Sequence, residues 1–166
     1  VIAGPGSRLS IVLGKCLGAT TVALLQAGIF LAFAPLAGFS FDSISWPLLL
    51  SGMFVASMGL TALGFAVAWL LDNVQAYHAI QMTLLVPLWV ISGAMFPADP
   101  NSSFFSTAMA VNPVAYGVSV VRHAMYGGLA PVETVLELSV PLCMSVLVLF
   151  TLGALGAAVG ICEFKR

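Results

Sequence analysis

Charged residues are scarce in this chain of 166 residues. Only 7% are Asp, Glu, Lys or Arg, whereas 61% are hydrophobic. A soluble domain usually carries about 25% charged residues, so most of the apolar side chains here must face lipid. The net charge of -1 comes without a basic tail, and nothing in it suggests binding to nucleic acid through phosphate contacts.

Motifs that carry chemistry are missing as well. The sequence contains no GxxxxGK[ST] phosphate loop, no HExxH and no GxSxG, so we expect no catalytic residue, cofactor or metal ion on this chain. His78 and His123 have no carboxylate or Cys companion at ligand spacing. The three cysteines (Cys16, Cys143 and Cys162) lie far apart, and we expect them to be small apolar packing residues.

The chain contains long runs of apolar residues. A helix needs roughly 20 apolar residues to cross about 30 Å of hydrocarbon, because lipid offers no partner for an unpaired backbone group. Four runs are long enough, at about 16–37, 47–71, 76–96 and 138–161. The sequence therefore predicts one all-α integral membrane domain with four transmembrane helices.

The few charges predict an orientation. Arg8 and Lys15 precede the first run, Lys165 and Arg166 follow the fourth, and the connection after the first run carries only Asp42. Four spans place both ends on one side, and the positive-inside rule makes that side cytoplasmic. We expect a multi-pass protein of the cell inner membrane.

The connection between the third and fourth runs predicts structure of its own, as two short external helices within about 102–127. Asn101-Ser102-Ser103 offers N-cap oxygens to the first helix, and Asn112-Pro113 ends it and begins the second. Gly127-Gly128 then supplies a C-cap. Such a broken pair is tolerated at membrane depth only against protein or a water-filled cavity.

Polar side chains within the apolar runs suggest a surface along which a substrate could cross the membrane. Gln26, Gln81 and Thr83 are candidates to line it, since an unpaired amide is costly in hydrocarbon. Pro87 should kink the third run by removing a backbone hydrogen bond. No carboxylate, Lys or Arg lies within a run, which disfavours ion coupling.

Small residues four positions apart suggest helix packing. Gly14 and Gly18, Gly52 and Ala56, and Gly156 and Gly160 are spaced in this way. Helices in lipid pack through such residues, which let two backbones approach closely.

Three motifs in order carry a family resemblance. Residues 4–15 read GPGSRLSIVLGK, 87–97 read PLWVISGAMFP, and 112–116 read NPVAY with Arg122 after them. They resemble the P-x-S-R-x-x-x-x-x-G-K, P-x-x-x-x-S-G-x-x-F-P and N-P-x-x-Y segments of type-2 ABC exporter permeases. The permeases that this chain resembles export drugs, nodulation factors or polysaccharides. Such permeases usually have six spans, so this chain would be the C-terminal part.

The resemblance implies a partner and a place for it to bind. An ATP-binding cassette subunit would hydrolyse ATP with Mg²⁺, and a second permease copy would complete the transporter. Segment 1–15 would be the cytoplasmic coupling segment, although Gly6 departs from the family pattern. Its ATPase contacts would be Arg8, Leu9, Val12 and Lys15.

The resemblance also implies an external gate around the third run and the two short helices. Its residues would be Pro87, Ser92, Gly93, Phe96, Pro97, Asn112, Pro113, Tyr116 and Arg122.

The function that we expect is a permease forming the path for a drug, lipid or glycan-like substrate. Two alternatives stay open. One is a secondary carrier or channel that works without ATP, and the other is a structural or assembly protein of the membrane.

Overall fold

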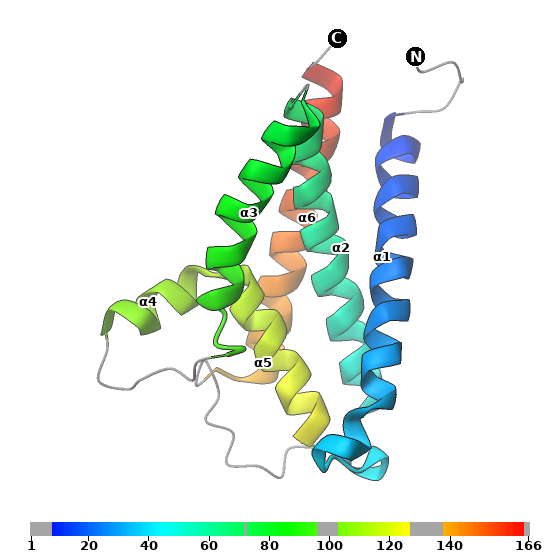
Figure 1. Ribbon diagram of the computed structural model, residues 1–166, viewed down its shortest axis with the longest axis vertical. Coiled ribbons are helices and arrows are strands. Elements are labelled where there is room, and N and C mark those ends of the chain that lie inside the picture. The colour runs from blue at the N-terminus through cyan, green and yellow to red at the C-terminus, as the bar shows by residue number, and fades with distance from the viewer. Residues whose placement is uncertain (1–7, 72, 96–102, 127–137, 165–166) are drawn as a thin grey trace.

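The computed structural model describes residues 8–71, 73–95, 103–126 and 138–164. Within these ranges every regular element is a helix, and no strand is present (Figure 1). The predicted all-α fold is therefore confirmed.

Among the helices of the described residues, three are long and apolar enough to cross a membrane. They are α1 (Arg8–Ala32), α2 (Trp46–Leu70) and α6 (Val140–Phe164), each of 25 residues. At 1.5 Å per residue each is about 37 Å long, more than the hydrocarbon thickness of a bilayer. The start of α1, the end of α6 and the connection after α2 lie at one end of the bundle (Figure 1).

The first predicted span is shifted along the chain. Helix α1 begins eight residues before the predicted start and ends at Ala32. Its early turns belong to the core, since Val12 and Cys16 are fully buried against α2 and α6. It ends early because Pro35 has no N–H to donate. The short 3-10 helices η1 (Ala34–Ala37) and η2 (Phe41–Ser43) follow, and together they form the turn into α2.

The helix at the third predicted span, 76–96, ends before the predicted end. Helix α3 (Val74–Val90) has 17 residues, about 25 Å. It continues for only three residues after Pro87, so this proline lies near a helix end and not at a kink within a continuing span. Gly93 then turns the chain with φ 76°, a conformation that favours glycine.

Two short helices, α4 (Ser103–Val111) and α5 (Pro113–Tyr126), confirm the predicted break at Asn112-Pro113. However, α5 does not lie wholly outside the bundle, because it packs against both α2 and α6. Gly117 approaches the side chain of Ala56, which lies ten residues into α2, or about 15 Å from its start. The chain therefore re-enters the bundle through α5 and returns to the end where η1 and η2 lie (Figure 1).

Helices α2 and α6 form the most extensive contact in the described part of the bundle. The hydroxyl oxygen of Thr151 lies 2.9 Å from the carbonyl oxygen of Val55 and 2.8 Å from that of Leu147, so its proton is shared between two helices. A Cβ atom placed on Gly59 would come within 2.6 Å of that hydroxyl oxygen. Close approach at a small residue, with a hydroxyl bond beside it, is the usual way in which helices associate in lipid.

The predicted small-residue pairs divide into two groups. Gly52 and Ala56 contact α5, so this pair forms a helix contact. A Cβ atom added to any glycine of the other two pairs would meet no atom within 4 Å, so those pairs are not contacts in this bundle. They are Gly14, Gly18, Gly156 and Gly160.

The substitution Gly59→Ala should destabilise the bundle by about 1 to 3 kcal/mol, because the added methyl group overlaps Thr151 and Phe150. The matched control is Gly153→Ala on α6, where a Cβ atom meets nothing within 4 Å. Thermal unfolding of the purified protein in detergent measures both. If the two variants unfold at the same temperature, α2 and α6 do not pack as described.

Candidate gate and translocation cavity

Backbone N–H and carbonyl groups at the end of α3 need hydrogen-bond partners, because lipid supplies none. The N–H of Ile91 donates to the carbonyl of Pro87 at 2.9 Å, and the N–H of Ser92 donates to that of Trp89 at 3.2 Å. The Ser92 hydroxyl is fully buried; it donates to the same Trp89 carbonyl at 2.6 Å and lies 3.3 Å from the N–H of Ala94. These bonds leave carbonyl groups just before and after the turn to be satisfied by other elements.

Asn112 joins the end of α3 to the start of α5. Its Nδ2 donates to the carbonyl of Leu88 at 2.6 Å, and its Oδ1 accepts from the N–H of Val114 at 3.0 Å. Only 4% of the residue is exposed. One amide therefore caps the N-terminus of α5 and also satisfies a carbonyl group in the last turn of α3. A carboxylate could only accept, and an apolar side chain could do neither.

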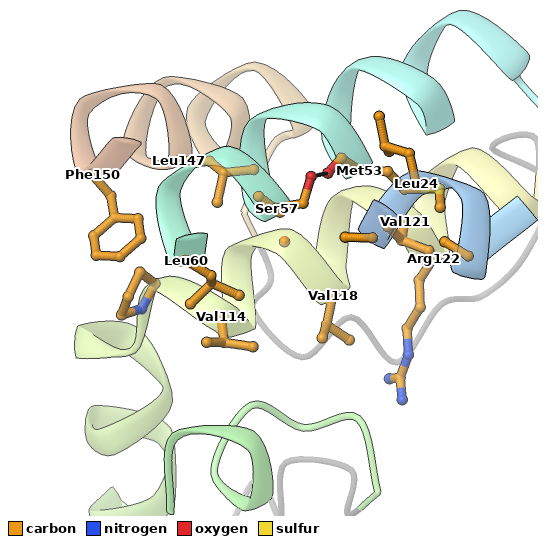
Figure 2. Close-up of a pocket in the computed structure, with 15 residues that line it drawn as sticks. Leu24, Met53, Ser57, Leu60, Val114, Val118, Val121, Arg122, Leu147 and Phe150 are labelled. Atoms are coloured by element: carbon orange, nitrogen blue, oxygen red, sulfur yellow. Dashed lines mark hydrogen bonds between the residues drawn. The ribbon is translucent and has the colours of Figure 1, made fainter. Parts of the chain in front are cut away.

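Arg122 makes the second connection. Its Nη2 donates to the carbonyl of Gly93 at 2.8 Å and lies 3.4 Å from that of Ala94. Figure 2 shows the guanidinium group pointing away from the neighbouring cavity while the aliphatic part of the side chain lies beside it. A cation near the C-terminal end of α3 is also favoured by the helix dipole.

Tyr116 fixes the corner between α4 and α5. Its hydroxyl donates to the carbonyl of Ala110 at 2.6 Å, and the ring is buried with Met109 and Ala115. Because Pro113 occupies the first turn of α5, the missing N–H costs nothing there. The two helices are therefore held at a fixed angle.

Most of the predicted gate residues thus belong to one connected region. Ser92, Gly93, Asn112 and Arg122 meet at the end of α3 through the hydrogen bonds given above. The predicted gate residues Phe96 and Pro97 lie outside the described residues, and the side chain of Pro87 is exposed on α3. Gating itself stays a prediction.

An apolar cavity of about 390 Å³ lies beside this region, between α1, α2, α5 and α6 (Figure 2). Ser57 is polar, yet its hydroxyl donates to the carbonyl of Met53 at 2.7 Å and so is satisfied within α2. The cavity can therefore take hydrocarbon but offers few polar contacts. Its other residues are Ala23, Leu24, Ala27, Ala56, Leu60, Pro113, Val114, Gly117, Val118, Val121, Arg122, Leu147 and Phe150.

The polar residues predicted to line a path do not meet in this cavity. Gln26 and Thr83 are exposed and do not line it. Gln81 lies in a second hollow of about 460 Å³ between α1, α2 and α3. The same hollow includes Lys15, which the sequence assigned to ATPase contact.

The predicted coupling segment is part of a helix. Arg8 begins α1, and Leu9 is 53% exposed. Val12 is fully buried beside Met58 and Ala158, so it contributes to the core and is not available as a contact surface. Of the predicted ATPase contacts, Arg8, Leu9 and Lys15 are therefore the ones left for a docking role.

Some important groups carry no sequence signal. The carbonyls of Leu88, Gly93 and Ala94 belong to the backbone, and only the fold shows that Asn112 and Arg122 reach them. The contact of Thr151 with α2 could have been suspected, since a buried hydroxyl in lipid needs an acceptor. Its partner, 96 residues earlier in the chain, could not.

Taken with the long apolar helices, this geometry defines a polytopic α-helical membrane protein with a re-entrant helix beside an apolar cavity. The sequence profile of the ABC-2 type transporter family matches residues 3–126. The chain belongs to this family. It is an integral multi-pass membrane protein.

Two relatives share a name. Nodulation protein J of Rhizobium leguminosarum bv. trifolii is 31% identical over 147 residues, which cover 86% of this chain and 53% of the relative. Nodulation protein J of Sinorhizobium fredii (strain NBRC 101917 / NGR234) is 28% identical over 118 residues, which cover 69% of this chain and 44% of the relative. This chain thus spans about half the length of these relatives. No solved structure matches.

The two functions of Asn112 can be separated by Asn112→Asp. The carboxylate still accepts from Val114 but has no proton to donate to Leu88, so we expect a loss of about 1 to 3 kcal/mol. Asn73→Asp is the matched control, because Asn73 at the start of α3 only accepts, from Gln75 at 2.8 Å. Thermal unfolding in detergent should show a lower midpoint for Asn112→Asp alone; equal midpoints would refute the connection.

Proposed function

We propose that this permease is the membrane-spanning part of an ATP-driven exporter that moves a drug, lipid or glycan-like amphiphile. ATP hydrolysis, with Mg²⁺, takes place on a separate ATP-binding cassette subunit, and a second permease copy completes the path. Both ends of this chain face the cytoplasm. Family membership supports the class of transporter, and the distribution of basic residues supports the orientation.

The cavity of about 390 Å³ is the observation that carries this proposal. One of its walls is α5, a helix of 14 residues that begins inside the bundle and does not cross it. A short wall helix can tilt with less loss of packing than a full span can. Its connections to α3 through Asn112 and Arg122 would transmit that movement, which is what a gate requires.

Transport should need both nucleotide and space in the cavity. The full-length permease is reconstituted with its ATPase, and uptake of a fluorescent amphiphile into inside-out vesicles is measured. Ala23→Trp should fill the cavity from α1 and reduce ATP-dependent uptake to near background. Ala32→Trp is the control, since Ala32 is exposed on the same helix and does not line this cavity.

The outcomes separate the alternative functions. Uptake that persists without nucleotide would instead indicate a secondary carrier or channel. Uptake that is absent under all conditions, with a folded and assembled complex, would favour a structural membrane protein. Equal activity of the two tryptophan variants would remove the cavity from the path.

Docking of the ATPase should depend on the first turn of α1. We expect Arg8→Glu combined with Leu9→Asp to abolish stimulation of ATP hydrolysis by the permease, because it reverses one charge and places another at an exposed apolar position. Leu36→Asp is the control; Leu36 is 86% exposed but lies at the opposite end of the bundle. Unchanged stimulation in the double variant would contradict docking at this site.

A further inference from the structure

A groove that contains four polar side chains among apolar ones lies between α1, α2 and α3, near the end of the bundle where α1 begins. Its volume is about 460 Å³, and it is the hollow that contains both Lys15 and Gln81. Thr61 and Tyr77 bring two hydroxyl groups to the same groove. Four polar side chains from three helices thus meet there, whereas the cavity beside α5 is almost wholly apolar.

The groups in this groove are suited to bind an anion. An ammonium offers only donors, while the amide, the phenol and the hydroxyl each add at least one donor. Within the described part of the chain, no acidic residue lines the groove, and none of the four side chains has a hydrogen bond to another residue. Phosphate or carboxylate oxygens would accept hydrogen bonds from all four side chains, and the bond from Lys15 would be charge-assisted.

The groove lies several ångströms inside the boundary between headgroups and hydrocarbon, within reach of a lysine side chain. Lys15 lies seven residues after the start of α1, and Gln81 lies seven after the start of α3, about 10 Å along each helix. Helices of about 37 Å extend past a hydrocarbon layer of about 30 Å by a few ångströms at each end. The exposed Lys15 can therefore reach the headgroup level while its stem stays in the groove.

An apolar track continues from the groove. Leu60 on α2 lines both the groove and the cavity beside α5. On α1, Lys15 and Ala19 line the groove, and Ala23 and Ala27 line the cavity, so one face of the helix with four-residue spacing runs from a cation along three small side chains. From Lys15 to Ala27 this face is about 18 Å long, which suits a hydrocarbon chain.

We propose that the groove binds an amphiphile with an anionic headgroup. The headgroup lies at Lys15, Tyr77 and Gln81, and the hydrocarbon chain follows Ala19 and Ala23 toward the cavity. The claim that this amphiphile is the substrate rests on the proposed transport function. The claim that the groove binds it does not. The amphiphile enters from the leaflet at the end where α1 begins, which is where the cation and the polar groups lie.

Lipid binding to the purified full-length protein tests this site without ATP or a partner. Native mass spectrometry in a neutral detergent compares phosphatidylglycerol with phosphatidylcholine at equal concentrations. Lys15→Gln should weaken phosphatidylglycerol binding by about fivefold, the usual effect of one basic residue on an anionic lipid, and leave phosphatidylcholine unchanged. Lys15→Arg should retain binding, and Tyr77→Phe should cause a smaller loss.

Two controls localise the effect. Lys165→Gln removes the same unit charge from the last residues of the chain, and phosphatidylglycerol binding should not change. Ala19→Phe narrows the track and should weaken phosphatidylglycerol binding while Lys15 is intact. If both lipids bind equally, or if Lys165→Gln acts like Lys15→Gln, lipid contact is non-specific and the proposal is overturned.

Other occupants give different results. Inorganic phosphate that displaces phosphatidylglycerol, with no effect of Ala19→Phe, would mean an anion site without a place for a chain. A Lys15→Cys variant that resists a water-soluble maleimide would mean that another helix or a second copy covers the groove. Either result overturns the proposal and leaves ATP-dependent transport untouched, while failed transport with specific lipid binding would overturn only the proposed function.

Discussion

The demand that backbone polar groups be paired inside a membrane governs this structure. Helix α3 ends about 25 Å after it begins, so carbonyl groups near its end lie where lipid offers no donor. Asn112 and Arg122 supply those donors from α5. Without them a helix could not stop within the bundle, and α5 could not begin there.

Packing then determines where space remains. Gly52, Ala56 and Gly59 allow α5 and α6 to approach α2 closely. Helix α1 contacts α2 and α6 but stands apart from α3 in Figure 1. The apolar cavity and the groove at Lys15 both lie along this side of α2, and both therefore follow from one arrangement of small and large side chains.

Two of the family motifs lie together at the wall of the cavity. The segment around Ser92 and Gly93, and the Asn112 to Arg122 segment, are separated by about 20 residues in sequence. In the structure they are joined by hydrogen bonds at the wall of the cavity. A connected polar cluster beside an apolar space is an arrangement in which movement of α5 and access to the cavity would be coupled.

The helical class, the long spans α2 and α6, and the break at Asn112-Pro113 could be predicted from the amino-acid order, because hydropathy and proline act locally along the chain. Hydropathy could not determine that the third apolar run stops at Val90, since an apolar residue scores alike in a span and in a buried turn. The depth of α5, the burial of Val12 and the presence of Lys15 and Gln81 in one groove became visible in the folded chain alone. Each of these depends on contacts between helices far apart in sequence, which no local pattern specifies.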